Sequence, residues 1–176
     1  MRVGLRALRG VGFIEALVYV GLLGLVAVLV ANFLMQTVRA YAEARAEREV
    51  LSNARLILET LSREIADARE VYAPTSRFYT DTGQISLITA QGKDADHETL
   101  YLDFWVANGF LYRRGEGQAT TTLSSGAVRV RKFYLERIIQ ALGREAIKIT
   151  LEVDWAGPKF IASTTVYSTA ALRGNY

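Results

Sequence analysis

The feature that most constrains this chain is a run of 23 residues, 16–38, that contains no charged side chain. About 20 consecutive apolar residues suffice for a helix to cross the hydrocarbon core of a bilayer. The chain is 176 residues long and 51% hydrophobic, which excludes a disordered protein and allows one further domain of ordinary size. We therefore expect a membrane-spanning helix followed by one folded domain.

The charges on either side of this run predict its orientation. Arg2, Arg6 and Arg9 precede it without an acidic residue, whereas Arg39 and Arg45 follow it among glutamates. The positive-inside rule then places the N-terminus in the cytoplasm and the bulk of the chain on the other side. The three leading arginines account for the whole net charge of +3, so the remainder is neutral overall.

Two common targeting segments fit this region less well. A secretory signal peptide has a shorter apolar core and small residues at its cleavage site, but Asn32–Met35 follows here. A plain signal anchor fits the charges and leaves Glu15 unexplained. A carboxylate carried toward the bilayer centre costs about 2–3 kcal/mol. Glu15 is therefore either solvated among headgroups or paired with a cation from elsewhere, such as a free α-amino group at Val11.

Gly10, Val11 and Glu15, with a basic head before them and the apolar run behind, resemble the N-terminus of type IV prepilins. The resemblance implies cleavage by a prepilin peptidase between Gly10 and Val11, and N-methylation of Val11. It makes Glu15 the fifth mature residue, which acts in assembly. The chain departs from the family in having Val11 where phenylalanine is usual, with Phe13 two residues later.

The resemblance also implies an organisation, a location and partners. It gives a cleaved leader at 1–10, a transmembrane and assembly helix at 11–38, and a periplasmic pilin-like domain at 39–176. The protein would span the bacterial inner membrane once and then join a fibre through its N-terminal helix, packing against other major and minor pilins or pseudopilins. Membrane-packing residues would be Phe13, Tyr19 and Phe33.

Beyond the run, the pattern predicts a long helix and then strands. Apolar residues recur at helical spacing, which predicts one helix from about 13 to about 71; they are Leu51, Ala54, Leu58, Leu61, Ile65 and Ala68. Asn108-Gly109 predicts a hairpin turn. Strands are expected at 85–88, 100–106, 110–113, 128–133, 147–155 and 160–167. The predicted fold is α+β and pilin-like, with one long helix packed on an antiparallel sheet of about five or six strands.

Length and pattern also resemble the J-type minor pseudopilins of type II secretion and the W-type minor pilins. The similar stretches are 54–65 in the helix, Gly109–Arg113 in a hairpin, and the ending Ala171-Leu172-Arg173. The resemblance implies a minor structural subunit that primes or caps the assembly of a type II secretion pseudopilus or a type IV pilus.

Two groups of residues are candidates for further binding. Asp94, Asp96 and Glu98 alternate on a segment that could supply oxygen ligands to calcium, although Lys93 competes and no central glycine fixes a coordinating turn. A solvated loop is the alternative, and His97 then belongs to that loop. No other metal or cofactor site is expected.

A loose basic set suggests an alternative function on the pilus, namely DNA or surface binding; its members are the candidates Arg113, Arg114, Arg129 and Arg131, with Lys132 beside them. The neutral total of the cleaved chain argues against DNA, because a broad electropositive face is then missing. An enzyme is not expected. The chain has no cysteine and one histidine, and it lacks a phosphate-binding loop and a nucleophile elbow.

Overall fold

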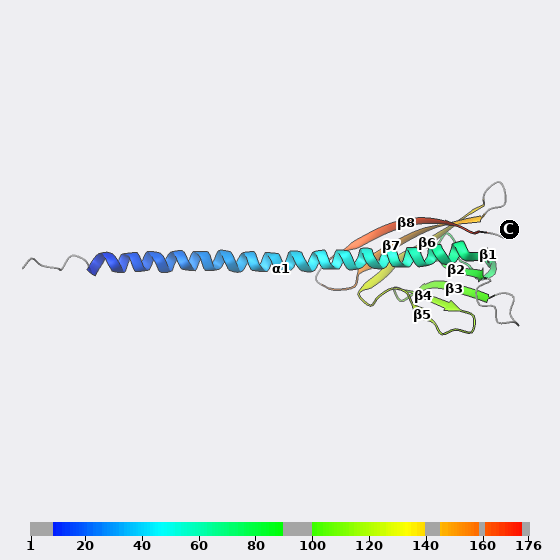
Figure 1. The fold of residues 1–176 in the computed structure, drawn as a ribbon, viewed down its shortest axis with the longest axis horizontal. Coiled ribbons are helices and arrows are strands. Elements are labelled where there is room, and N and C mark those ends of the chain that lie inside the picture. The colour runs from blue at the N-terminus through cyan, green and yellow to red at the C-terminus, as the bar shows by residue number, and fades with distance from the viewer. Residues whose placement is uncertain (1–8, 90–99, 140–144, 159–160, 174–176) are drawn as a thin grey trace, which may run out of the picture. The chain divides into compact units, whose positions relative to one another are not determined.

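A computed structural model describes residues 9–89, 100–139, 145–158 and 161–173 (Figure 1). The chain forms two compact units, Met1–Ala44 and Arg45–Tyr176. The helix α1 (Arg9–Asp67) has 59 residues and contributes to both units. We call residues 12–38 the apolar segment and the unit Arg45–Tyr176 the sheet domain.

The long helix is confirmed, but it ends earlier than the pattern predicts. No glycine or proline interrupts the chain between Gly24 and Asp67, so nothing in this stretch favours a break in the helix. Strand β1 (Ala68–Val71) follows at once, and Ala68 pairs with Thr89 in the neighbouring strand. The predicted helix end near residue 71 is therefore wrong, because sheet pairing captures the last four residues.

The strands form two antiparallel sheets, where the sequence predicts one. A five-stranded sheet has the order β1-β2-β3-β4-β5, and a three-stranded sheet has the order β6-β7-β8. The further strands are β2 (Gln84–Thr89), β3 (Leu100–Ala107), β4 (Phe110–Gly115), β5 (Thr121–Thr122), β6 (Val128–Ile139), β7 (Glu145–Trp155) and β8 (Ser163–Ala171). All six predicted strands are present, and β1 and β5 are additional. The α+β class and the pilin-like architecture, a long N-terminal helix packed on antiparallel sheets, are confirmed.

The predicted hairpin turn lies between β3 and β4. Ala107 pairs with Phe110, and Asn108 and Gly109 between them have φ angles of 53° and 75°. Two successive residues with positive φ are typical of the type I′ turn, whose twist matches that of the flanking strands. Asn-Gly is the dipeptide that adopts this conformation at least cost.

A short edge segment, residues 79–83, connects the two sheets along β6. The Tyr79 amide donates to the Leu135 carbonyl at 3.0 Å, and the Phe133 amide donates to the Asp81 carbonyl at 2.8 Å. The Gly83 amide donates to the Phe133 carbonyl at 2.7 Å. A Cβ on Gly83 would lie 2.6 Å from that carbonyl oxygen, so this close approach requires glycine.

A single apolar core fills the space between α1 and both sheets. The buried helix residues are Ala46, Val50, Ala54, Ile57, Leu61 and Ile65. They recur every three or four positions, so the last part of α1 buries one face. Alternate residues of the central strands complete the core; they include Ile85, Leu87, Phe104, Leu111, Phe133, Leu135, Ile147, Ile149, Leu151 and Val153.

The buried face of α1 includes only some of the apolar residues that the helical spacing predicts to be buried. Ala54, Leu61, Ile65 and Ala68 are buried as predicted, but Leu58 is half-buried and Leu51 remains 36% exposed. Asn53 takes a place within the buried face. Its amide donates to the Glu49 carbonyl at 2.9 Å, and its Oδ1 accepts from the Ser125 amide at 3.0 Å. These bonds offset the cost of burying its side chain.

Candidate assembly helix and surface sites

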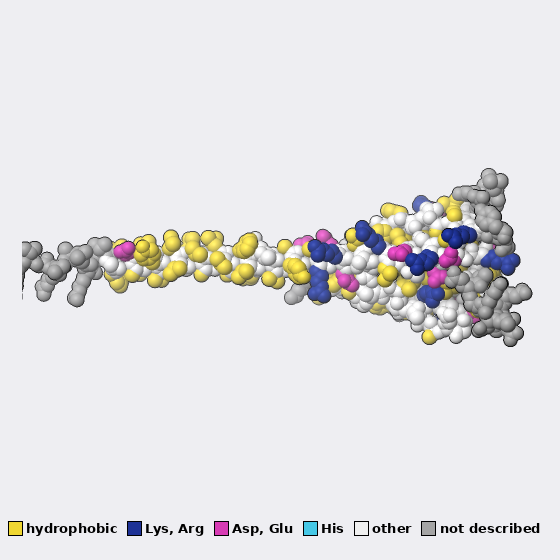
Figure 2. All heavy atoms as spheres, in the orientation of Figure 1, with side chains coloured by type: hydrophobic (Ala, Val, Ile, Leu, Met, Phe, Trp, Pro, Cys, Tyr) yellow, Lys and Arg dark blue, Asp and Glu magenta, His cyan; other side chains and the backbone are white. Residues whose placement is uncertain are grey.

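The first candidate site is the apolar segment of α1. Every side chain from residue 12 to residue 38 is exposed, and the large apolar ones surround the helix. Figure 2 shows hydrophobic side chains along the visible face of this part of α1. By length and composition the helix can cross a membrane. One long apolar N-terminal helix of this kind suggests a membrane anchor or a signal sequence.

The predicted packing residues are exposed, like the other large apolar side chains of this segment. Phe13, Tyr19 and Phe33 are 70%, 59% and 67% exposed. Burying a large apolar side chain stabilises by about 1.5–3 kcal/mol. This surface is therefore available to lipid tails or to neighbouring helices.

Glu15 is the only charged residue of the apolar segment. Its carboxylate accepts a hydrogen bond from the Tyr19 hydroxyl one turn later, at 3.5 Å. Among the side chains that the structure describes, which begin at residue 12, none of the ion pairs involves Glu15. Gly10 and Val11, the predicted cleavage pair, belong to the first turn of α1. The geometry thus leaves the Glu15 carboxylate available to a positive group from elsewhere.

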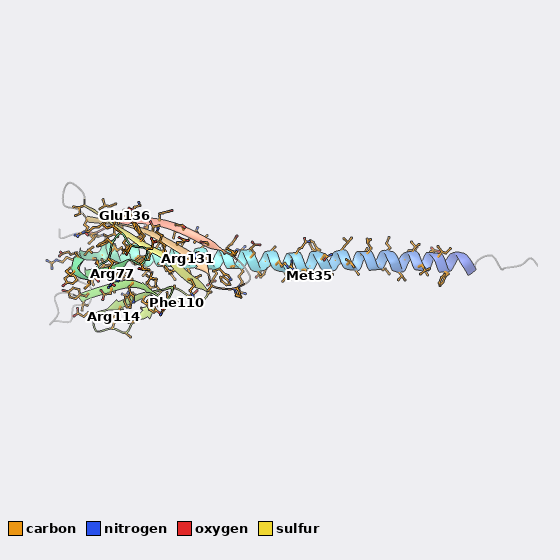
Figure 3. All side chains as sticks on the ribbon, turned by 180° about the vertical axis from the view of Figure 1, so that it is seen from behind. Met35, Arg77, Phe110, Arg114, Arg131 and Glu136 are labelled. Atoms are coloured by element: carbon orange, nitrogen blue, oxygen red, sulfur yellow. The ribbon has the colours of Figure 1, made fainter. Side chains whose placement is uncertain are left out.

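The four candidate DNA-binding arginines come from both sheets and contact groups of the fold itself. Arg113 on β4 forms an ion pair with Glu64 of α1 at 3.1 Å. Arg131 on β6 forms one with Asp154 at 3.0 Å. Figure 3 labels Arg131 together with Arg114, which lies on β4. Carboxylates of this chain therefore compete with phosphate for Arg113 and Arg131, and Asp103 does so for Arg114.

The other two arginines stack on aromatic rings of the β3–β4 hairpin. The Arg129 guanidinium lies 4.2 Å from the ring centre of Phe110. Arg114 lies 5.7 Å from the Trp105 ring and 3.5 Å from an Asp103 oxygen. Trp105 itself stacks on Tyr112 across the strands at 5.7 Å. Such cation–π and cross-strand contacts each stabilise by about 0.5–1 kcal/mol, which accounts for these arginines structurally.

The predicted calcium ligands Asp94, Asp96 and Glu98, and His97 beside them, lie outside the described residues. Within the described ranges no group of three His, Cys, Asp or Glu side chains could hold a metal ion. The calcium hypothesis thus stays a prediction.

Ion pairs of the three-stranded sheet shift the pKa values of their cations. A hydrogen bond to Glu136 raises the pKa of Lys148, and one to Asp81 raises the pKa of Lys132. The pKa of Arg137 is raised by its hydrogen bond to Glu145. All three cations are stabilised in the charged form by a carboxylate of the same sheet or its edge segment.

The edge of the three-stranded sheet has a signal that the sequence interpretation missed. Residues 160–172 contain no charged side chain, between Lys159 and Arg173. The structure shows that most of this stretch is β8, the outer strand of its sheet. The absence of charge predicts a strand but does not by itself reveal an edge.

Comparison of the chain with protein-family models, with curated proteins and with solved structures finds no match. Function must therefore be inferred from the residues and the architecture.

Proposed function

We propose that this protein is a minor pilin or pseudopilin, a structural subunit of a type II secretion pseudopilus or a type IV pilus. It waits in the inner membrane after removal of residues 1–10 and then primes or caps the assembly of a periplasmic fibre. The supporting observation is the combination of a prepilin-like motif, Gly10 to Glu15, with a helix that is apolar all round before it enters a sheet domain.

The apolar segment supports assembly by lateral helix packing. A helix that only anchors the protein in the membrane needs an apolar stretch of sufficient length, and the charge of Glu15 would shorten that stretch. In a fibre, the Glu15 carboxylate of one subunit meets the α-amino group that cleavage creates on Val11 of its neighbour. The pair sets the register between helices, because either charge alone among apolar side chains is strongly unfavourable.

The N-terminus of the mature protein tests the proposal. The full chain is expressed with a prepilin peptidase, extracted from the membrane with detergent and analysed by mass spectrometry. We expect a mature N-terminus at Val11, with a methyl group on part of the population. A matched variant, Gly10→Leu, should remain uncut because the residue before the scissile bond is altered.

Two outcomes contradict the proposal. An N-terminus at Met1 in the presence of an active peptidase would remove the pilin assignment. An N-terminus beyond residue 30 would identify the apolar run as a conventional signal peptide.

A further inference from the structure

The turn between β3 and β4 contains the two groups that react in asparagine deamidation. Asn108 carries a side-chain carboxamide, and the next main-chain nitrogen belongs to Gly109. When this nitrogen attacks the carboxamide carbon, a five-membered succinimide ring closes within the chain. Glycine favours the attack because it has no Cβ to shield its nitrogen. Asn108 is the only asparagine in the sequence that is followed by glycine.

The structure leaves both reacting groups free of hydrogen bonds. Asn108 is exposed to solvent. Ala107 pairs with Phe110 on either side of the turn, and the Gly109 carbonyl accepts from the Val130 amide at 2.9 Å. Within the described ranges no hydrogen bond engages the Asn108 carboxamide or the Gly109 N–H. The peptide group between these two residues can therefore reorient toward the side chain without breaking a hydrogen bond of the fold.

The two other asparagines within the described ranges lack these properties. Asn32 lies inside α1, and Asn53 is 7% exposed with its side chain bonded to the Glu49 carbonyl and the Ser125 amide. The residues after them, Phe33 and Ala54, carry side chains, and their N–H groups belong to the hydrogen-bond ladder of the helix. Asn32 and Asn53 are therefore internal controls.

We propose that Asn108 is a site of spontaneous covalent modification, where asparagine is converted into aspartate and isoaspartate. The Gly109 nitrogen loses its proton and bonds to Cγ of Asn108, while the bond from Cγ to Nδ2 breaks and ammonia leaves. Water then opens the ring at one of its two carbonyl carbons. Opening at Cγ gives aspartate, and opening at the main-chain carbonyl carbon gives isoaspartate. The reaction is redox-neutral, and the proposal does not depend on the proposed pilin function.

The two products differ in what they do to the turn. Aspartate leaves the main chain unchanged, and Asp-Gly also favours the type I′ conformation. In isoaspartate the main chain runs through the former side chain and is longer by one methylene group. A two-residue turn whose backbone is lengthened no longer matches the register of its strands. Both products add a negative charge, so only the isoaspartate changes the backbone geometry.

The turn also connects the two sheets, so a change in its backbone extends to β6. The Gly109 carbonyl accepts from the Val130 amide, and a Cβ on Gly109 would lie 2.8 Å from Cδ of Arg129. The Arg129 guanidinium in turn lies 4.2 Å from the ring centre of Phe110, which Figure 3 labels at the start of β4. Isoaspartate at position 108 should therefore loosen the contact between the hairpin and β6.

Incubation of the purified full chain in detergent micelles tests the modification. The buffer is mildly alkaline, because the attacking nitrogen must lose its proton. Digests taken over time are analysed by mass spectrometry, and isoaspartyl methyltransferase labels the isoaspartate. We expect both products at Asn108, formed faster by about tenfold or more than any conversion of Asn32 or Asn53.

Two outcomes of this incubation would overturn the proposal. The first is an unmodified Asn108 in the folded chain while the same chain in denaturant is converted, because the turn would then protect the residue. The second is conversion of Asn53 at the same rate as Asn108, because neither the following glycine nor the free groups of the turn would then matter.

Asn108→Gly is the matched variant. Gly-Gly also adopts the type I′ turn, so the hairpin should be kept while the carboxamide is removed. After the same incubation, the peptide that contains this turn should carry no isoaspartate label. Continued labelling of that peptide would assign the signal to another residue and contradict the proposal. Thermal unfolding at the start shows that the variant and the wild type are both folded.

Amide hydrogen exchange tests the effect on β6. Asn108→Asp supplies the new charge on an unchanged main chain. We expect faster exchange of the Val130 amide in aged wild-type protein, but not in fresh Asn108→Asp or in aged Asn108→Gly. Unchanged exchange at Val130 in protein that contains isoaspartate would overturn the effect on the sheet contact. Equal acceleration in fresh Asn108→Asp would assign the effect to charge and contradict the role of backbone length.

Discussion

The two parts of α1 differ in how their apolar residues are distributed, although one uninterrupted helix contains both. In the apolar segment, residues 12–38, large apolar side chains are exposed on every side. In the last part, residues 45–67, one face is buried under the sheets and the opposite face carries charged side chains such as Arg55 and Glu59.

This difference assigns each part a different source of stability. A helix that is apolar all round needs lipid or other helices, whereas a one-sided helix needs a single apolar partner surface. The sheet domain supplies that surface itself, since Ile57, Leu61 and Ile65 are fully buried in it. The apolar segment has no such cover, so its contacts must come from outside the chain.

Replacing Glu15 is expected to give the largest effect, and only on assembly. Glu15→Ala removes the counter-charge of a neighbouring α-amino group, and an unpaired charge buried among helices costs about 3–5 kcal/mol. Recovery of partner pilins by crosslinking should fall accordingly, at equal membrane levels of the protein. Cleavage after Gly10 and the unfolding of the sheet domain should not change.

A control separates pairing from mere solvation of the carboxylate. Glu15→Asp keeps the charge one methylene shorter and should restore part of the recovery. Equal recovery of partners with wild type and Glu15→Ala would show that the carboxylate is solvated among headgroups, and the two parts of α1 would then differ only in apolarity.

Matched leucine truncations test the comparison directly. Leu61→Ala removes a fully buried side chain and should lower the free energy of unfolding of the sheet domain by about 2–4 kcal/mol. Leu25→Ala removes a side chain that is 62% exposed and should leave the free energy of unfolding unchanged. Denaturant unfolding followed by tryptophan fluorescence reports on the domain, because Trp105 and Trp155 both lie in it. A similar loss in both variants would mean that the apolar segment also packs on the domain.

Local patterns of strong period or turn chemistry could be predicted from the sequence. The alternation from Ile147 to Trp155 and the Asn108-Gly109 turn are both found as expected, because each depends on neighbouring residues alone. The apolar segment was equally predictable from its composition. These features carry the fold class and the candidate assembly helix.

Features that depend on distant partners could not be predicted. The buried face of α1 includes Asn53, whose side-chain oxygen accepts a hydrogen bond from Ser125 in a loop 72 residues later. A pattern of apolar residues alone does not predict that Asn53 is buried, and it wrongly predicts that Leu51 is. The connection between the two sheets includes the contact of Gly83 with Phe133, fifty residues later in the chain. The open edge at β8 follows from strand order, which single strands do not specify.

Gly83→Ala sharpens the account of the sheet domain. The added Cβ would approach the Phe133 carbonyl oxygen to 2.6 Å, so the edge segment must move away from β6. We expect a loss of about 1–3 kcal/mol in the free energy of unfolding, as for other overpacked sites. Faster amide exchange at Phe133 should accompany it, because that amide donates to Asp81.

Gly126→Ala is the control for this substitution. No atom lies within 4 Å of the position where its Cβ would be, so unfolding should change little. An unchanged free energy of unfolding in Gly83→Ala would show that the edge segment does not hold the sheets together.

The smallest effect concerns the charges that distinguish the sheet domain from the apolar segment. Lys148 has a raised pKa in the folded state because of its hydrogen bond to Glu136. A raised pKa gives a contribution to stability that is fully present below the ordinary lysine pKa of about 10.5 and is lost as pH rises through the folded value. Lys148→Gln should therefore be slightly less stable than wild type at neutral pH, and the difference should vanish in strongly alkaline solution.

Because the side chains of Lys148 and Glu136 are both partly exposed, added salt should also reduce this difference in stability. Denaturant midpoints of the two proteins, measured in parallel from neutral to alkaline pH, decide the matter. A difference that stays constant with pH would assign the effect to packing of the lysine methylenes, and the outer face of the domain would then owe its stability to apolar contact, as the apolar segment does.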